Sequence, residues 1–127
     1  SIEVSSNKDE LASPLESKAV FANATVYFEF DKFNLSTRSI QALKSIIELM
    51  KENSAIEITI AGHADERGTR EYNLALGQRR AESVANYLAL KGISKSRLTI
   101  KSYGEEMPAV SSSNERSWAR NRRAEIN

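Results

Sequence analysis

A strand-like apolar alternation, a glycine and a long amphipathic helix follow one another between residues 56 and 90. Isoleucines alternate with polar residues over 56–60, which is the period of a half-buried strand. Gly62 ends this pattern, and a helix is expected from about Arg70 to Leu90. The apolar positions of that helix form one stripe: Ala81, Val84, Ala85 and Leu88. This strand–helix unit favours a layered fold with the helix packed on a sheet.

Similar signals before and after this unit complete the predicted architecture. Strands are expected over 26–30, over 98–104 and over 122–127, and Ser36 and Asn114 are plausible N-caps of a second and a short third helix. The helix after Ser36 has its own apolar stripe of Leu43, Ile46, Ile47 and Met50. The order β-α-β-α-β-(α)-β predicts an α+β fold, an α/β sandwich in which helices cover one face of a mixed four-stranded sheet.

Composition sets the domain limits and narrows the function classes. Residues 1–20 are rich in Ser, Glu and Lys, so they are interpreted as a flexible tail or linker before one globular domain over 21–127. Eighteen basic and 17 acidic residues give a net charge of +1, which does not favour binding to nucleic acid or to a membrane surface. The basic stretch 116–123 is interpreted as a solvated helix end with Trp118 packed on the core. No cysteine is present for a disulfide or a thiolate metal site.

An acid and a base lie on opposite sides of the turn between the strand and the long helix. Asp65 follows the strand by a few residues, and Arg80 is in register with the apolar positions Leu76 and Val84 of the helix. A fixed carboxylate and a fixed guanidinium suggest a site for a small zwitterion. The spacing leaves two alternatives open, in which Arg80 only extends along the core or forms a structural salt bridge with Asp65. Thr69 is also a candidate N-cap of the helix, whose first amides could hold a carboxylate.

His63 is the only histidine of the chain. A single histidine without cysteine makes a poor zinc set, and no nucleophile motif accompanies it. We therefore expect His63 to be structural, and we expect neither a metal nor another cofactor.

Four segments in the same order resemble the OmpA-like C-terminal domain family. They are FEFDKFNL (28–35), GHADERGTREYNLALGQRRAESV (62–84), SYGEEMPA (102–109) and NRRAEI (121–126), and the resemblance covers residues 24–126. The second segment favours the wall-associated lipoproteins of this family over its porin-attached and flagellar-stator members. The resemblance implies an OmpA-like fold and non-covalent binding, without catalysis, to the meso-diaminopimelate of the peptidoglycan stem peptide.

The resemblance also assigns roles to residues at matching positions. It implies that Asp65 binds the ammonium of diaminopimelate and that Arg80 binds its carboxylate. Backbone amides near the two loops would assist, and two further side chains would line the pocket. By position, the amides belong to Thr69, Phe30 and Asp31, and the lining side chains to Asn73 and Leu76.

Partners and location follow from the same resemblance. It implies a place at the periplasmic face of the outer membrane and contacts with Tol-system proteins, a TolB-like propeller and a TolA-like periplasmic domain. Such lipoproteins carry a signal peptide and a lipidated N-terminal cysteine, which this sequence lacks, so we expect membrane attachment only through an anchor absent from this form. Two alternatives stay open: the wall-binding domain of an OmpA-type porin, or a peptidoglycan hydrolase that uses His63, Asp65 and Glu66.

Overall fold

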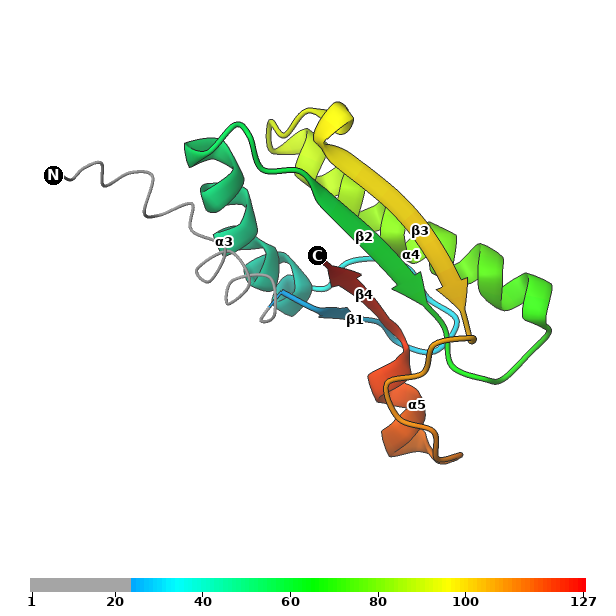
Figure 1. The fold of residues 1–127 in the computed structure, drawn as a ribbon. Coiled ribbons are helices and arrows are strands. Elements are labelled where there is room, and N and C mark those ends of the chain that lie inside the picture. The colour runs from blue at the N-terminus through cyan, green and yellow to red at the C-terminus, as the bar shows by residue number, and fades with distance from the viewer. Residues whose placement is uncertain (1–23) are drawn as a thin grey trace, which may run out of the picture.

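The computed structural model describes residues 24–127, and the predicted tail over 1–20 lies outside this range. Three α-helices, one short 3-10 helix and four strands make up the described part (Figure 1). In chain order they are β1 (Val26–Tyr27), α3 (Thr37–Glu52), β2 (Ile58–His63), α4 (Arg70–Leu90), η1 (Lys95–Arg97), β3 (Leu98–Gly104), α5 (Glu115–Asn121) and β4 (Arg123–Ile126). None of these helices is both long and apolar enough to cross a membrane.

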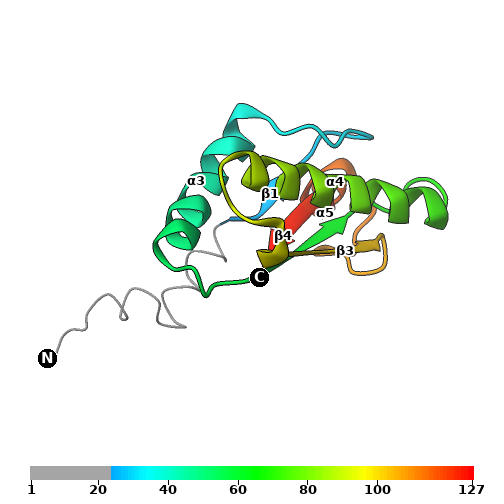
Figure 2. The same ribbon diagram turned by 90° about the horizontal axis from the view of Figure 1, so that it is seen from above.

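The four strands form one mixed sheet in the order β1-β4-β2-β3. β2 and β3 are parallel, while β4 is antiparallel to β1 on one side and to β2 on the other. Ala124 of β4 therefore pairs with both Val26 and Gly62. α3 and α4 lie on the same side of the sheet, as the view from above shows (Figure 2). The predicted α+β architecture is confirmed.

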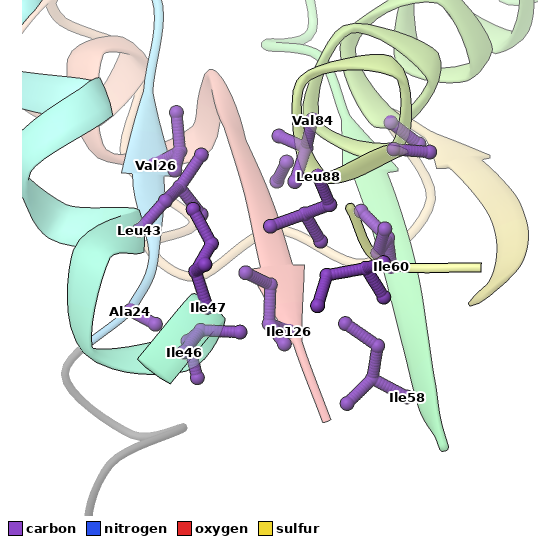
Figure 3. Close-up of a cluster of buried hydrophobic side chains, with 14 of the residues drawn as sticks. Ala24, Val26, Leu43, Ile46, Ile47, Ile58, Ile60, Val84, Leu88 and Ile126 are labelled. Carbon is purple, nitrogen blue, oxygen red and sulfur yellow. The ribbon is translucent and has the colours of Figure 1, made fainter. Parts of the chain in front are cut away.

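The hydrophobic core fills the space between this pair of helices and the sheet (Figure 3). Every residue of the two predicted helix stripes is buried. The strands contribute alternate residues to the same cluster, among them Val26, Ile58, Ile60 and Ile126. Removing this apolar surface from water is the main term that stabilises the two-layer arrangement.

Local signals place the helix ends where the sequence predicts them. The Ser36 side chain accepts a hydrogen bond from the amide of Ser39 at 3.1 Å, which caps α3. Thr69 caps α4 in the same way, and Asn114 caps α5. Gly92 follows α4 with a φ of +102°, a left-handed conformation that suits glycine after a helix C-terminus.

Two predicted strands have different bounds in the structure. β1 covers only the first two residues of the predicted 26–30, because the carbonyls of Glu29 and Lys32 accept hydrogen bonds from Arg80 and so the chain turns away from the sheet. β2 lies at 58–63 and not at 56–60. The carbonyl of Ile56 is bound by the Arg97 side chain, whereas the register with β3 continues to His63.

Two glycines let α4 lie unusually close to β2. A Cβ atom on Gly62 would lie 1.7 Å from the carbonyl oxygen of Gly77, and one on Gly77 would lie 2.4 Å from the Ser102 hydroxyl. A Cβ atom at either position would require neighbouring atoms to shift, and at Gly62 these atoms belong to the backbone of the helix. This contact fixes α4 relative to the carboxyl end of β2, where Asp65 emerges.

Candidate functional site

A pocket of about 390 Å³ lies beyond the carboxyl end of β2, between the loop that leads to α4, one side of α4 and the loop over 28–35. The structure brings together all seven residues that the sequence singles out. Four other residues line the pocket with them, namely Ala64, Arg67, Gly68 and Tyr72. The predicted residues are Phe30, Asp31, Asp65, Thr69, Asn73, Leu76 and Arg80.

Asp65 is only 4% exposed, and its carboxylate is held mainly by Arg67. Arg67 donates from Nε to Oδ1 at 3.1 Å and from Nη2 to Oδ2 at 2.8 Å, and its backbone amide donates to Oδ1 at 3.0 Å. Arg122 lies farther away, with Nη1 3.5 Å from Oδ2. Burial raises the pKa of Asp65, but the hydrogen bonds from Arg67 outweigh it and hold the pKa below its ordinary value. Asp65 is therefore an ionised carboxylate at neutral pH.

Arg80 is completely buried and is bound to peptide carbonyls. Its Nε donates to the Lys32 carbonyl at 2.8 Å, Nη1 to that of His63 at 2.9 Å and Nη2 to that of Glu29 at 3.1 Å. Burial, with a smaller effect from Arg122, lowers its pKa to about 10, so it stays charged at neutral pH. Among residues 24–127 no carboxylate lies within ion-pair distance of Arg80, so the alternative of a structural salt bridge with Asp65 is wrong.

A guanidinium group has five N–H donors, and in Arg80 the Nε, Nη1 and Nη2 atoms each donate one hydrogen bond to a described residue. Two N–H groups therefore have no acceptor among the described residues. The three carbonyl bonds orient the group and tie the 28–35 loop to the end of β2, so the position of the cation is set before a ligand arrives.

The loop between Asp65 and α4 is held by Asn73, which is 1% exposed. Its side-chain amide donates to the carbonyls of Asp65 and Arg67, each at 3.1 Å, and to the carboxylate of Glu105 at 2.7 Å. Gly68 completes the turn with a φ of +100°, a value that side chains disfavour. Asn73 is thus a positioning residue for Asp65 as well as part of the pocket lining.

Asp31 and Tyr72 face each other across the pocket. The Tyr72 hydroxyl donates a hydrogen bond to the Asp31 carboxylate, which raises the pKa of Tyr72. Asp31 has a φ of +60°, one of the left-handed positions that only a few residue types tolerate. The pair links the 28–35 loop to the first turn of α4.

Arg67 and Trp118 were not expected at the site. The Arg67 guanidinium lies over both the Phe30 and the Trp118 rings, 4.1 Å from each ring centroid. Trp118 also donates a hydrogen bond from Nε1 to Glu66 at 2.9 Å. The interpretation of Trp118 as a core residue is wrong, and so is that of 116–123 as a wholly solvated end, because Arg122 and Arg123 are buried. The available signal was the arginine two residues after Asp65.

His63 is buried on the opposite side of β2 from the residues that face α4. Its ring is 3% exposed and stacks on Tyr103 at a centroid distance of 5.5 Å. Neither ring nitrogen has a hydrogen-bond partner among residues 24–127. Burial first, then Arg123, lowers its pKa to about 4, so it is neutral at physiological pH. Within the same range, no group of three or more His, Cys, Asp or Glu residues is placed to hold a metal ion.

Comparison with known proteins shows the family to which this chain is similar. The model of the OmpA family matches residues 27–122. The chain is 45% identical over 111 residues to the peptidoglycan-associated lipoprotein of Pseudomonas putida, which covers 87% of this chain and 66% of that protein. It is also 45% identical over 100 residues to the protein of that name from Pasteurella multocida, with 79% and 67% covered. The chain thus spans about two thirds of the length of these relatives.

Solved structures show the same fold. The peptidoglycan-associated lipoprotein from Burkholderia pseudomallei superposes with a TM-score of 0.81 at 40% identity, over 84% of this chain and 91% of that chain. The cell wall anchor of the type VI secretion system from Pseudomonas aeruginosa gives a TM-score of 0.67 at 25% identity, over 80% and 76%.

Proposed function

The chain belongs to the OmpA family, and from that premise we propose that it is a non-catalytic peptidoglycan-binding domain that recognises the meso-diaminopimelate of the stem peptide. In this function it anchors the outer membrane to the cell wall as part of a Tol-Pal system. The names of its relatives, a peptidoglycan-associated lipoprotein and a cell wall anchor, support the general class. The chemistry of the pocket supports the ligand.

One observation carries the proposal: the pocket holds a buried acid and a buried base that are not paired with each other. Arg80 has a positive charge that no carboxylate pairs with among the described residues, and it lines the same pocket as the acid Asp65. The four charged side chains of the lining, Asp31, Asp65, Arg67 and Arg80, sum to zero. A neutral zwitterion enters such a pocket without a net charge penalty.

The far end of diaminopimelate carries an ammonium and a carboxylate on one carbon atom. In the proposed complex the carboxylate accepts the two remaining N–H groups of Arg80, a bidentate arrangement that a guanidinium favours. Asp65 receives the ammonium. Amides of Phe30, Asp31 and the first turn of α4 after Thr69 are the further donors, because the first amides of a helix have no intrahelical acceptor.

The geometry gives no support to the hydrolase alternative. His63 is buried against Tyr103 on the far face of β2, so it is not available as a general base beside Asp65. Glu66 accepts from Trp118 and is not part of the pocket lining. The porin alternative uses the same domain and the same ligand chemistry, so it differs only in the anchor.

The proposal includes partners and a location. The domain works at the periplasmic face of the outer membrane, where a lipid anchor of the longer protein holds it. The resemblance supports contacts with a TolB-like propeller and a TolA-like periplasmic domain.

Co-sedimentation with purified sacculi tests the proposal. We expect the wild-type protein to pellet with sacculi, to be released by free muropeptide, and to liberate no soluble fragments. Asp65→Asn should bind more than tenfold more weakly, because loss of one partner of a desolvated charge pair costs about 2–5 kcal/mol. Glu57→Gln, which removes an exposed carboxylate elsewhere on the domain, is the matched control. Equal sedimentation of both variants and the wild type would contradict the assignment.

Ligand selectivity tests the role of Arg80. A lysine-type stem offers an ammonium but lacks the second carboxylate, which leaves buried donors unpaired. We expect it to bind about thirtyfold more weakly than the diaminopimelate-type stem, equivalent to roughly 2 kcal/mol. Calorimetric titration with the two matched muropeptides measures the ratio. Identical dissociation constants would mean that the carboxylate is not recognised.

A further inference from the structure

We propose that Arg67 is a displaceable cation that holds the ammonium position on Asp65 and has to release this carboxylate before a ligand ammonium can bind. The inference rests on the proposed function, and it makes Arg67 a specificity-determining residue of the same pocket.

The Asp65 carboxylate has no free acceptor position in this structure. Two carboxylate oxygens offer about four lone-pair sites. Oδ1 accepts from Nε and from the backbone amide of Arg67, and Oδ2 accepts from Nη2 of Arg67 and lies 3.5 Å from Nη1 of Arg122. With 4% of Asp65 exposed, an incoming ammonium cannot add a further bond from the solvent side. One resident donor therefore has to leave.

Arg67 is the donor that can leave. Its side chain is 32% exposed, whereas that of Arg122 is 7% exposed. Arg122 is also fixed by hydrogen bonds to the Phe28 carbonyl at 2.8 Å and to Glu115 at 3.1 Å. Exchange of Arg67 for a ligand ammonium keeps one positive charge on Asp65, so the buried acid is never left unpaired.

Glu115 offers the Arg67 guanidinium a second carboxylate. Its Oε1 lies 3.9 Å from Nη2 of Arg67, the atom that donates to Asp65, and its side chain is 69% exposed. The same guanidinium lies over the rings of Phe30 and Trp118, at 4.1 Å from each ring centroid, and these cation–π contacts do not depend on the bonds to Asp65. Movement toward Glu115 would release Oδ2 of Asp65 while the guanidinium keeps a carboxylate partner.

This exchange restricts what the pocket accepts. A ligand without an ammonium group gains nothing at Asp65, because Arg67 stays in place. A ligand with an ammonium group but no carboxylate has to displace a bidentate pair without a compensating bond to Arg80. Only a ligand with both groups recovers the cost of the displacement.

The test is calorimetric titration of the full chain with a muropeptide that ends in meso-diaminopimelate. We expect Arg67→Leu to bind roughly fivefold more tightly than the wild type, since the competing ion pair is gone. Arg67→Lys keeps the charge but not the planar, bidentate guanidinium, so its affinity for the muropeptide should lie between those of the wild type and Arg67→Leu. The matched control is Arg70→Leu, because Arg70 is exposed, pairs with Glu106 at 2.9 Å and lies outside the pocket lining.

Trp118 supplies an independent readout, because it is the only tryptophan of the chain and its ring contacts Arg67. Its fluorescence emission should change as the wild type binds muropeptide, and this change should have the same midpoint as the calorimetric titration. The emission should change much less in Arg67→Leu. Equal or weaker binding by Arg67→Leu, or an equal gain in Arg70→Leu, would overturn the inference while the proposed function stands. A wild-type protein that binds no muropeptide would overturn the proposed function, and the inference with it.

Discussion

At the scale of single residues, the guanidinium of Arg80 has two tasks. It joins the 28–35 loop to the end of β2 through three carbonyls, and it keeps its charge beside a buried acid. The position of this arginine among apolar helix residues predicts its burial. Its carbonyl partners could not be predicted, because they come from segments of the chain that only the folded structure brings together.

Arg80→Lys separates charge from geometry. An ammonium cannot span three carbonyls as a planar fork does, so at least one buried acceptor loses its donor, at a cost of about 1–3 kcal/mol. We expect a lower free energy of unfolding in urea and sacculus binding reduced more than tenfold. Arg79→Lys, the same change at the exposed neighbour, should leave both unchanged. Full stability and binding in Arg80→Lys would show that charge alone suffices.

His63 predicts a loss of stability in mild acid. Its pKa is lowered from 6.5 to about 4, so between these values the unfolded chain takes up a proton that the folded chain does not. The contribution of His63 to the free energy of unfolding should therefore be fully present above pH 6.5 and should fall by about 3 kcal/mol as the pH drops to 4. His63→Phe keeps a ring on Tyr103 and should show a flatter profile in urea unfolding at pH 7.5, 5.5 and 4.5. The same slope in both proteins would assign the effect to other groups.

At the scale of elements, the contact between β2 and α4 sets the geometry of the site. Asp65 leaves the end of one element and Arg80 projects from the other, so their separation depends on the approach that Gly62 and Gly77 permit. Helix ends and stripes were predictable, since caps and a 3.6-residue period are local. The strand bounds were not predictable, because they depend on distant partners. Arg80 donates a hydrogen bond to the Glu29 carbonyl just beyond β1, and the length of β2 is set by its pairing with β3 and β4.

Gly62→Ala should disturb this contact. The new Cβ atom meets a backbone carbonyl that cannot rotate away, and overpacking of this kind costs about 1–3 kcal/mol or more. Gly77→Ala should lose less stability, because its Cβ atom meets the Ser102 hydroxyl at 2.4 Å and the Gly62 backbone oxygen only at 2.9 Å, and because alanine favours a helix. Thermal melts and sacculus binding measure both effects. A Gly62→Ala protein as stable as the wild type would show that the helix has room to move.

At the scale of the whole molecule, the order of the sheet depends on its last strand. β4 lies between β1 and β2, so within residues 24–127 the two halves of the sheet are connected only through residues 123–126. The sequence predicts four strands and their layer but not this order, because the pairing of short strands far apart along the chain leaves no local pattern.

A chain that ends at Arg122 should therefore not fold. β1 would lose its partner, and β2 would keep only β3. We expect no cooperative melt by circular dichroism and no binding to sacculi. Ala124→Gly and Ile126→Ala in the intact chain are graded controls that weaken the strand without removing its hydrogen bonds. A cooperative melt of the shortened chain within a few degrees of the wild type would contradict the central role of β4.

The same placement has a consequence in time. Val26 pairs with Ala124, so the ribosome has synthesised nearly the whole domain before β4, the strand that joins the two halves of the sheet, has been made. Until then the nascent polypeptide exposes the apolar faces of α3 and α4 and two unpaired strand edges, which are sites of aggregation and of chaperone binding. Such non-local pairing also slows folding. The domain therefore reaches its native state late in synthesis, after residues 123–126 have been made, and the nascent chain stays incompletely folded until then.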